Sequence, residues 1–529
     1  MSTTREIWLA GQWVPAGAGN TIQAVDPSTG ESVGDLFPVS DWSNCDLALE
    51  AAQSAATVLR LAPRAAIAKF LRDYADAIDA NAESLANMAA LETGLPVSPR
   101  LKDVELPRTS NQLRLAAEAC ESPSWAEATI DTATGIRSCR QAIGPVFVIG
   151  PNNFPLAFNG ISGGDFAAAI AAGNPVIVKS HPAHPNTTYL LAELASQCLK
   201  GSELPAATVQ LLYHMSSEDG LRIARDSRLG AVAFTGSKAA GLKLKQACDE
   251  VGKPVYLEMS SVNPVLILPG VLEERSADLA GELATSCSMG CGQFCTNPGL
   301  VVVLQSPKTD EFIQTLTQRF AEAGTGTMLT SGVLEHLQAS VTTVRKNGAE
   351  VLSGGDLNGE MKNSYQNTLL KVSGDRFLAN PSVMQTEMFG PVSLLVVAED
   401  LLQAEAIINE LEGNLTGTIY SAIDGRDDSL YDTLASRLAE KVGRLLNDKM
   451  PTGVAVSSAM NHGGPFPSSG HPGFTAVGIP ASLKRFSALK CYDNVRPKRL
   501  PQLLADANPD GKTWRWIDGK WTLENVASS

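Results

Sequence analysis

One cysteine of this sequence stands in a setting suited to covalent chemistry. The segment 292–298, Gly-Gln-Phe-Cys-Thr-Asn-Pro, places Cys295 in a turn rich in glycine, asparagine and proline. A cysteine whose thiolate is stabilised by a helix N-terminus or by backbone amides is a nucleophile toward a carbonyl carbon. A buried, inert thiol is the commoner fate of a cysteine, so Cys295 alone does not define a function.

Two further polar residues follow predicted strands and would complete such a reaction. Glu258 ends the apolar run 255–257, at the sheet edge where α/β proteins place their chemistry, and as a general base it would activate water. Asn153 follows a strand ending at Gly150, where its amide could donate to a developing oxyanion. Taken singly, such an acid is often merely solvated and such an asparagine is often a helix cap.

The cysteines near the nucleophile leave a different class of protein open. Cys287, Cys291 and Cys295 are spaced four residues apart, so a continuous helix would place three sulfur ligands on one face. A metal-binding protein or a catalytically silent scaffold therefore stands as the non-enzyme alternative. The spacing lacks the close Cys-x-x-Cys pair of common metal sites, and the turn around Cys295 should end the helix. We predict no resident metal.

Composition restricts the function further. The 529 residues suffice for roughly two to four domains, and 56 acidic against 42 basic residues give a net charge of -14. That charge argues against nucleic acid as a partner. No apolar run approaches the ~20 residues that cross a bilayer, and nine scattered cysteines fit free thiols in a reducing compartment. We expect a cytoplasmic protein without membrane attachment.

Hydrophobic periodicity predicts an α/β fold with doubly wound parallel sheets. Apolar residues at spacings of three and four predict amphipathic helices between 47 and 115. Short β-rich runs alternate with helical stretches after that, which is typical of parallel sheets. The expected strands are 145–150, 175–179, 209–212, 231–236 and 254–257, followed by the doubly buried runs 265–268, 301–304 and 392–397.

One strand, turn and helix start could receive a phosphate. Gly236 and Ser237 follow a predicted strand, and Gly241 lies within the helix that begins there. Backbone N–H groups at a helix N-terminus bind phosphate, although the full G-x-G-x-x-G pattern is lacking. His181 and His184 stand between prolines that prevent a regular helix, so we interpret this pair as shaping a loop.

Together these segments resemble the aldehyde dehydrogenase superfamily, and the motifs follow the family's order over nearly the whole chain. They are Asn-Phe-Pro at 153–155, Lys179 closing a strand, Phe-Thr-Gly-Ser at 234–237, Glu258, Gly-Gln-Phe-Cys at 292–295 and Glu-Met-Phe-Gly-Pro at 387–391. The segments 92–96, 108–114, 179–185, 260–264, 451–454 and 462–467 look like the branch of 2,5-dioxopentanoate (α-ketoglutarate semialdehyde) dehydrogenases and NADP-dependent fatty-aldehyde dehydrogenases.

The resemblance implies a complete reaction. Cys295 would attack the aldehyde, while the Asn153 amide and the Cys295 backbone N–H hold the oxyanion. Hydride would leave for the nicotinamide, and Glu258 would activate water to hydrolyse the resulting thioester. The product would be a free carboxylate, as in the hydrolytic rather than the coenzyme A-acylating branch. The best substrate prediction is 2,5-dioxopentanoate.

The resemblance also implies a cofactor site that contains Lys179, Ser180, His181, Gly236, Ser237, Gly241, Glu387 and Phe389. Lys179 would reach the adenosine ribose, and Glu387 would reach the nicotinamide ribose. Many NAD-preferring members carry a glutamate three positions after the lysine, where this chain has Pro182. The absence of that carboxylate removes repulsion against a 2′-phosphate. We therefore predict NADP as cofactor, with NAD possible.

The substrate remains open at two points. The segment 468–474 departs from the Asp-Ala-Arg run expected in that branch and is expected to border the substrate entrance. A semialdehyde carboxylate also needs a cationic anchor, and the helix expected to start at Phe154 offers none before Lys179. A broad-specificity or long-chain aldehyde dehydrogenase is therefore the alternative.

The family's organisation implies domain boundaries and an oligomer. Residues 1–127 and 141–256 would form the dinucleotide-binding domain, 257–457 the catalytic domain, and 458–485 a return segment. Residues 128–140 and 486–500 would form an oligomerisation arm, followed by a C-terminal tail, 501–529, with clustered tryptophans. Extended arms with little core of their own usually pair between subunits, so a homo-oligomer, a dimer or tetramer, is expected.

Overall fold

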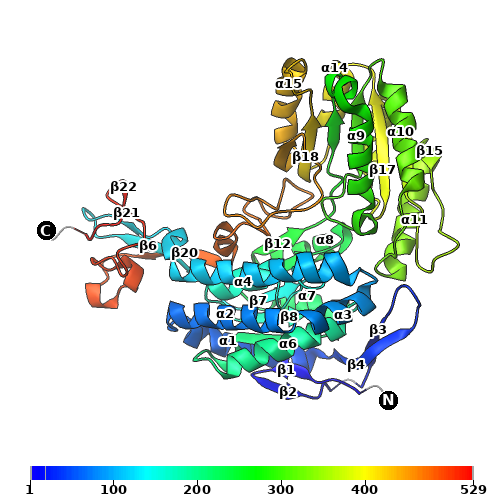
Figure 1. The fold of residues 1–529 in the computed structure, drawn as a ribbon. Coiled ribbons are helices and arrows are strands. Elements are labelled where there is room, and N and C mark those ends of the chain that lie inside the picture. The colour runs from blue at the N-terminus through cyan, green and yellow to red at the C-terminus, as the bar shows by residue number, and fades with distance from the viewer. Residues whose placement is uncertain (1–2, 18, 527–529) are drawn as a thin grey trace.

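Two seven-stranded sheets organise the chain, one above the other in Figure 1, and a smaller sheet extends to one side. The computed structural model describes residues 3–17 and 19–526. The first sheet has the order β12 (Val255–Glu258), β11 (Ala231–Thr235), β7 (Val146–Ile149), β8 (Val176–Lys179), β9 (Val209–Leu212), β1 (Ile7–Leu9) and β2 (Gln12–Val14). Its first five strands are parallel, as the alternating pattern predicts.

Helices cover this sheet, and an amphipathic helix does so by burying one apolar stripe. Helix α2 (Arg64–Ala80) buries Phe70, Tyr74 and Ile78 at the predicted spacing of four. The other helices around this sheet are α1 (Trp42–Leu59), α3 (Ala82–Thr93), α4 (Leu106–Glu121), α5 (Gly164–Ala171), α6 (Pro185–Lys200), α7 (Ser217–Arg225) and α8 (Lys238–Asp249). To the right of β1 and β2 in Figure 1 lie β3 (Thr21–Val25) and β4 (Ser32–Ser40), and β4 pairs with β10 (His214–Met215).

The second sheet has the order β15 (Glu350–Ser353), β16 (Thr368–Ser373), β17 (Val392–Ala398), β14 (Leu300–Leu304), β13 (Val265–Ile267), β18 (Asn414–Tyr420) and β19 (Val442–Asn447). All its pairings are parallel except that of β15. Its helices are α9 (Pro269–Ser288), α10 (Thr309–Glu322), α11 (Ser331–Lys346), α12 (Gly374–Ala379), α13 (Pro381–Met384), α14 (Leu401–Asn409) and α15 (Asp428–Ala439). The strands predicted from continuous apolar runs are present and buried.

The C-terminal tail extends the smaller sheet. Strands β20 (Ser487–Tyr492), β6 (Arg137–Ala142) and β5 (Thr129–Ile130) come from the two predicted arm segments. The tail adds β21 (Arg515–Ile517) and β22 (Lys520–Thr522), with β21 parallel to β5. Arg515 is fully buried and donates to the carbonyls of Ala505 and Glu524. The tail therefore covers an edge of the sheet that the arm would otherwise leave unpaired.

The helix expected to start at Phe154 is absent, because α5 begins only at Gly164. The side chains between them bond to nearby backbone instead: Ile161 N donates to Asn159 Oδ1, and Ser162 Oγ donates to Leu156 O. Such local bonds compete with a helix. A Cβ at Gly163 would lie 2.7 Å from Phe158 Cα, so the loop folds back tightly on itself.

The carboxyl ends of the strands in the first sheet face the amino ends of the strands in the second sheet. The candidate site residues lie at these strand ends. Thr235 lies opposite Glu258 and Ile149 opposite Lys179, so β12, β11, β7 and β8 end together. The chain leaves β7 toward β8 on one side and returns to β11 on the other, and ligands bind at such a switch point. The segments just before β14 and β17 of the second sheet carry Cys295 and Glu387.

Among residues 3–17 and 19–526, no helix combines the length and the apolar character that crossing a bilayer requires.

Candidate active site

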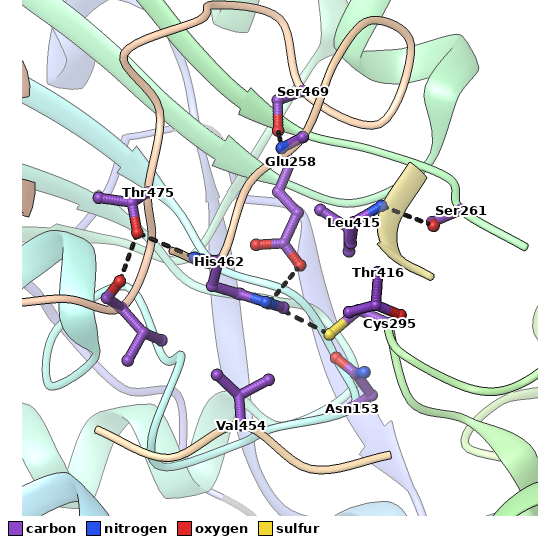
Figure 2. A network of polar contacts seen from close by, with 12 residues as sticks. Asn153, Glu258, Ser261, Cys295, Leu415, Thr416, Val454, His462, Ser469 and Thr475 are labelled. Carbon is purple, nitrogen blue, oxygen red and sulfur yellow. Dashed lines mark hydrogen bonds and ion pairs between the residues drawn. The ribbon is translucent and has the colours of Figure 1, made fainter. Parts of the chain in front are cut away.

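Three side chains from distant parts of the chain meet between the two sheets. Cys295 Sγ lies 3.4 Å from His462 Nε2, and the same nitrogen lies 3.1 Å from Glu258 Oε1. Figure 2 shows the imidazole between the thiol and the carboxylate. Glu258 and His462 are each only 1% exposed. A partly buried nucleophile therefore contacts a buried proton acceptor, which in turn contacts a buried carboxylate, and this is the arrangement of an activated nucleophile.

His462 is a site residue that the sequence interpretation did not assign. It lies in an irregular segment, where its backbone N–H donates to Thr475 Oγ1 at 3.0 Å and its carbonyl accepts from Ala476 N at 2.9 Å. The following glycines allow close passage, since a Cβ at Gly464 would lie 2.1 Å from Asn414 O. The one indication of His462 in the sequence was that segment 462–467 resembles a motif of the family, and that resemblance gave the histidine no role.

The backbone of Glu258 is held by the segment that departs from the family pattern. Met259 N donates to Ser468 O at 2.8 Å, and Glu258 forms a bridge with Ser469. Gly470 N donates to Leu257 O at 3.0 Å. The contacts of residues 468–470 are therefore with the end of β12. Because Glu258 Oε2 is buried and has no hydrogen-bond partner among the described residues, that oxygen is free to accept a proton.

The turn of Cys295 is held by side-chain amides. Asn263 Nδ2 donates to the carbonyls of Cys295 and Asn297, both at 2.9 Å. Asn263 has a φ of 47°, a left-handed conformation that asparagine tolerates better than most residues. Asn414 Oδ1 accepts from Val262 N and Asn263 N. These bonds fix the nucleophile turn to the amino ends of β13 and β18.

The environment of Cys295 keeps its proton on sulfur. Burial raises the pKa of the thiol well above its ordinary value, and the nearby Glu258 charge raises it further, while Arg108 lowers it. The direction of this shift disfavours a resting thiolate. The thiol needs a base at the moment of attack, and His462 and Glu258 are the groups within reach.

Asn153 lies beside the thiol as expected. Its Nδ2 donates to Gln293 O at 3.0 Å, and Figure 2 shows its amide next to Cys295. An amide nitrogen carries two hydrogens, so one stays available for a developing oxyanion. The Asn153 carbonyl accepts from Arg100 at 3.1 Å, which fixes the loop after β7.

The three cysteines at helical spacing do not form a common site. Helix α9 ends at Ser288, and Cys291 has a φ of 57°, so the helix face is broken before Cys295. Among the described residues, the one group of three side chains placed to hold a metal is Glu258, Cys295 and His462, whose donor atoms lie within 4.8 Å of one another. Mixed sulfur, nitrogen and oxygen donors can bind a divalent ion. An added metal ion that bound here would occupy the catalytic side chains and inhibit the reaction.

The predicted adenosine-side residues lie at the ends of β8 and β11. Lys179 ends β8 and its Nζ donates to Ser180 O at 3.1 Å; burial lowers the pKa of this lysine to about 8. Ala183 N donates to His181 Nδ1, and burial lowers the pKa of His181. Ser237 caps α8 by accepting from Ala240 N. Gly241 lies in that helix against Met259, where a Cβ would meet the sulfur at 2.7 Å.

The predicted nicotinamide-side residues line a cleft between the sheets. Its volume is about 270 Å³, and its walls include Lys238, Ser260, Glu387 and Asn414. Glu387 Oε1 accepts from Ser261 N at 3.2 Å, and burial raises the pKa of this carboxyl. Phe389 lines an adjoining cavity with Phe294. Two arginines of the first domain are already engaged: Arg228 is paired with Asp46 and Asp226, and Arg222 stacks on Trp42.

The family model and the relatives that match this chain describe aldehyde dehydrogenases. Residues 13–488 match the model of the aldehyde dehydrogenase family. The chain is 37% identical over 527 residues to alpha-ketoglutaric semialdehyde dehydrogenase 2 of Azospirillum brasilense, covering 96% of this chain and 98% of that protein. It is 34% identical over 514 residues to alpha-ketoglutaric semialdehyde dehydrogenase of Acinetobacter baylyi, covering 95% and 96%.

Solved structures agree on the fold. Aldehyde dehydrogenase C of Pseudomonas syringae, solved with NAD+ and octanal, aligns with a TM-score of 0.81 and 22% identity, covering 94% of this chain and 98% of that one. Lactaldehyde dehydrogenase of Escherichia coli aligns with a TM-score of 0.80 and 22% identity, covering 93% and 99%. The predicted fold class is confirmed.

Replacing Glu258 by Gln should make Cys295 more reactive toward an alkylating agent while removing turnover. The negative charge that raises the thiol pKa is lost, so the pH profile of Cys295 alkylation should move down by about one unit or more. Peptide mass spectrometry of iodoacetamide-treated protein measures this, with the exposed Cys491 as internal reference. An unchanged or upward-shifted Cys295 profile would show that Glu258 does not hold the proton on sulfur.

Proposed function

The chain belongs to the aldehyde dehydrogenase family, and from that premise we propose that it oxidises 2,5-dioxopentanoate to the dicarboxylate with NADP. The enzyme oxidises an aldehyde, as the family match and the relatives along the whole chain establish. The substrate proposal is supported by the two semialdehyde dehydrogenases at 37% and 34% identity. The observation that carries the mechanism is the Cys295, His462 and Glu258 contact.

In the proposed first step, Cys295 attacks the aldehyde carbon as its proton leaves for His462 or Glu258. The carbonyl oxygen becomes an oxyanion, which the second Asn153 amide hydrogen and the Cys295 backbone N–H stabilise. The nicotinamide of bound NADP supplies the hydride acceptor. Loss of hydride from the former aldehyde carbon leaves a thioester on Cys295.

In the proposed second step, Glu258 takes a proton from water through its unpartnered Oε2. His462 occupies Oε1 at 3.1 Å, which leaves Oε2 as the oxygen that can face the water. Attack on the thioester breaks the carbon–sulfur bond, and the proton returns to Cys295. The sum is aldehyde, NADP+ and water giving carboxylate, NADPH and two protons, without coenzyme A.

The adenosine end of the site fits a 2′-phosphate. Lys179 has a carbonyl as its hydrogen-bond partner among the described residues, and its ammonium lies at the carboxyl edge of β8. Ser180 N donates to Leu212 O, which brings His214 alongside; His214 Nδ1 is buried without a partner in the described part of the chain. A phosphate dianion would give both groups a partner, and Pro182 contributes no opposing carboxylate.

A direct test of the substrate compares 2,5-dioxopentanoate with pentanal, octanal and decanal, each with NADP and with NAD. We expect kcat/KM for the carboxylated aldehyde to exceed that for pentanal by about tenfold or more, because a carboxylate adds a specific contact that a methyl group lacks. A higher kcat/KM for octanal or decanal would support a long-chain aldehyde dehydrogenase instead.

Glu258→Gln should separate the two chemical steps. Rapid mixing should give one equivalent of NADPH per site, whereas steady turnover should fall by about 100-fold or more, because the base for hydrolysis is lost. Cys295→Ala, the matched control, should give no burst. Full steady turnover in Glu258→Gln would contradict the assigned base, and a loss of burst and turnover together would place Glu258 in the first step.

Pro182→Glu should reduce the preference for NADP. The new carboxylate would stand near the 2′-phosphate, so the ratio of kcat/KM for NADP over NAD should fall by about tenfold or more. Pro182→Ala removes the ring without adding charge and should keep the ratio. Equilibrium titration of each cofactor by fluorescence gives an independent reading. Equal ratios in the two variants would show that the 2′-phosphate binds elsewhere.

A further inference from the structure

Arg108 brings a positive charge to the active site, and it has no acidic partner among the described residues. It lies in the first turn of α4, and its Nη1 donates to Val454 O at 2.7 Å. Its Nε and Nη2 are buried and have no hydrogen-bond partner among the described residues. Within the same residues, no carboxylate oxygen lies within the 4.0 Å limit for an ion pair with it. Glu105, one turn earlier, is already paired with Arg100.

Two aromatic rings, those of Phe154 and Phe158, lie beside the guanidinium of Arg108 and connect it to the reacting groups. Its central carbon lies 5.1 Å from the centre of the Phe158 ring and 6.0 Å from that of Phe154. The Phe158 ring in turn lies 6.1 Å from the imidazole of His462. Val454, which binds Arg108, is among the residues drawn around Cys295 in Figure 2. Burial lowers the pKa of Arg108, and the electrostatic effect of the nearby Cys295 is the largest of those that raise it.

In the other two arginines near the site, Arg100 and Arg444, both terminal nitrogens have hydrogen-bond partners, and only Nε of each is buried without a partner among the described residues. Arg100 pairs with Glu105 and donates to Asn153 O. Arg444 directs both terminal nitrogens to the segment before Val454, with Nη2 at 3.0 Å from Pro451 O and Nη1 at 3.5 Å from Gly453 O. Arg108 differs because Nε and Nη2, the two nitrogens of one edge of the guanidinium, are both free. That edge matches the two oxygens of a carboxylate.

We propose that Arg108 binds the substrate carboxylate, at the end of the molecule opposite the aldehyde, through Nε and Nη2. This inference rests on the proposed function and names the cationic anchor that a semialdehyde substrate requires. This anchor lies in α4, about 45 residues before the segment from Phe154 to Lys179, in which we expect a cation and the sequence offers none before Lys179. Arg108 thereby becomes a specificity-determining residue for carboxylated aldehydes, while Cys295, His462 and Glu258 act on the aldehyde end.

A buried cation without a partner is costly, and a carboxylate that pairs with it offsets that cost on binding. The contact exists only for substrates that carry the charge. Removing Arg108 also removes a positive charge that lowers the pKa of Cys295, so kcat/KM should fall somewhat for every aldehyde. The fall should be much larger for a carboxylated aldehyde than for an uncharged aldehyde of the same length, because only the first loses the contact with its carboxylate. A purely structural role for Arg108 would affect both substrates alike.

The test compares Arg108→Met and Arg108→Lys with the unmodified enzyme on 2,5-dioxopentanoate and pentanal, with NADP. Arg108→Met should lower the ratio of kcat/KM for 2,5-dioxopentanoate over kcat/KM for pentanal by about 30-fold or more, mainly through the KM of the carboxylated substrate. Arg108→Lys should fall between, because it keeps the charge without the fork. Arg114→Met is the matched control: Arg114 lies on the same helix and pairs with Asp76 and Asp79, so both substrates should be unaffected.

Inhibition by glutarate provides a second measurement that needs no turnover of a carboxylated aldehyde. Its inhibition constant against pentanal should rise by a similar factor in Arg108→Met, with an unchanged melting temperature. Equal losses on both substrates would overturn the anchor. If the unmodified enzyme does not prefer 2,5-dioxopentanoate over pentanal, the proposed substrate is contradicted. Inhibition by glutarate then tests the role of Arg108 by itself, because undiminished inhibition of Arg108→Met would overturn the carboxylate site. If Arg108→Met does not fold, Arg108→Lys decides by the same comparison.

Discussion

The central constraint on this structure is the placement of a partly buried thiol, a buried imidazole and a buried carboxylate within 4.8 Å of one another. Polar groups removed from water are stable only when neighbouring groups satisfy them. The fold meets this requirement by bringing the carboxyl edge of one parallel sheet against the amino edge of another. Glu258 comes from the first edge and Cys295 from the second, so neither sheet alone contains the reaction.

The segment that returns from the second sheet completes this junction. After β19, residues 448–480 pass between the sheets and supply His462, while Ser468 holds the backbone at the end of β12. Arg108 and Arg444 bind carbonyls of the same segment at Val454 and Pro451. The irregular backbone is thus fixed by side chains and by close glycine contacts rather than by regular structure, and the position of His462 depends on all of them.

The sequence predicted what depends on local pattern. Continuous apolar runs gave the strands of both sheets, and a polar residue at a strand end gave Glu258, because parallel strands bring their carboxyl ends together. His462 was missed because its neighbours are glycines and prolines without periodicity, and its partners lie 167 and 204 residues away. The helix expected at Phe154 failed because side chains such as Asn159 bond to the local backbone. Arg108 was missed because a cation at a helix start normally indicates only a solvated face.

The charges around Cys295 explain why its sulfur is protonated at rest and loses the proton only during the reaction. Glu258 raises its pKa and Arg108 lowers it, so these two groups act in opposite directions on one proton. If a substrate carboxylate pairs with Arg108, the guanidinium charge is compensated and its support for a thiolate weakens. Sulfur would then lose its proton only as it bonds to the aldehyde carbon, with His462 and Glu258 as acceptors. A free thiolate would not accumulate, so the buried nucleophile would be protected from reagents other than the correctly bound aldehyde.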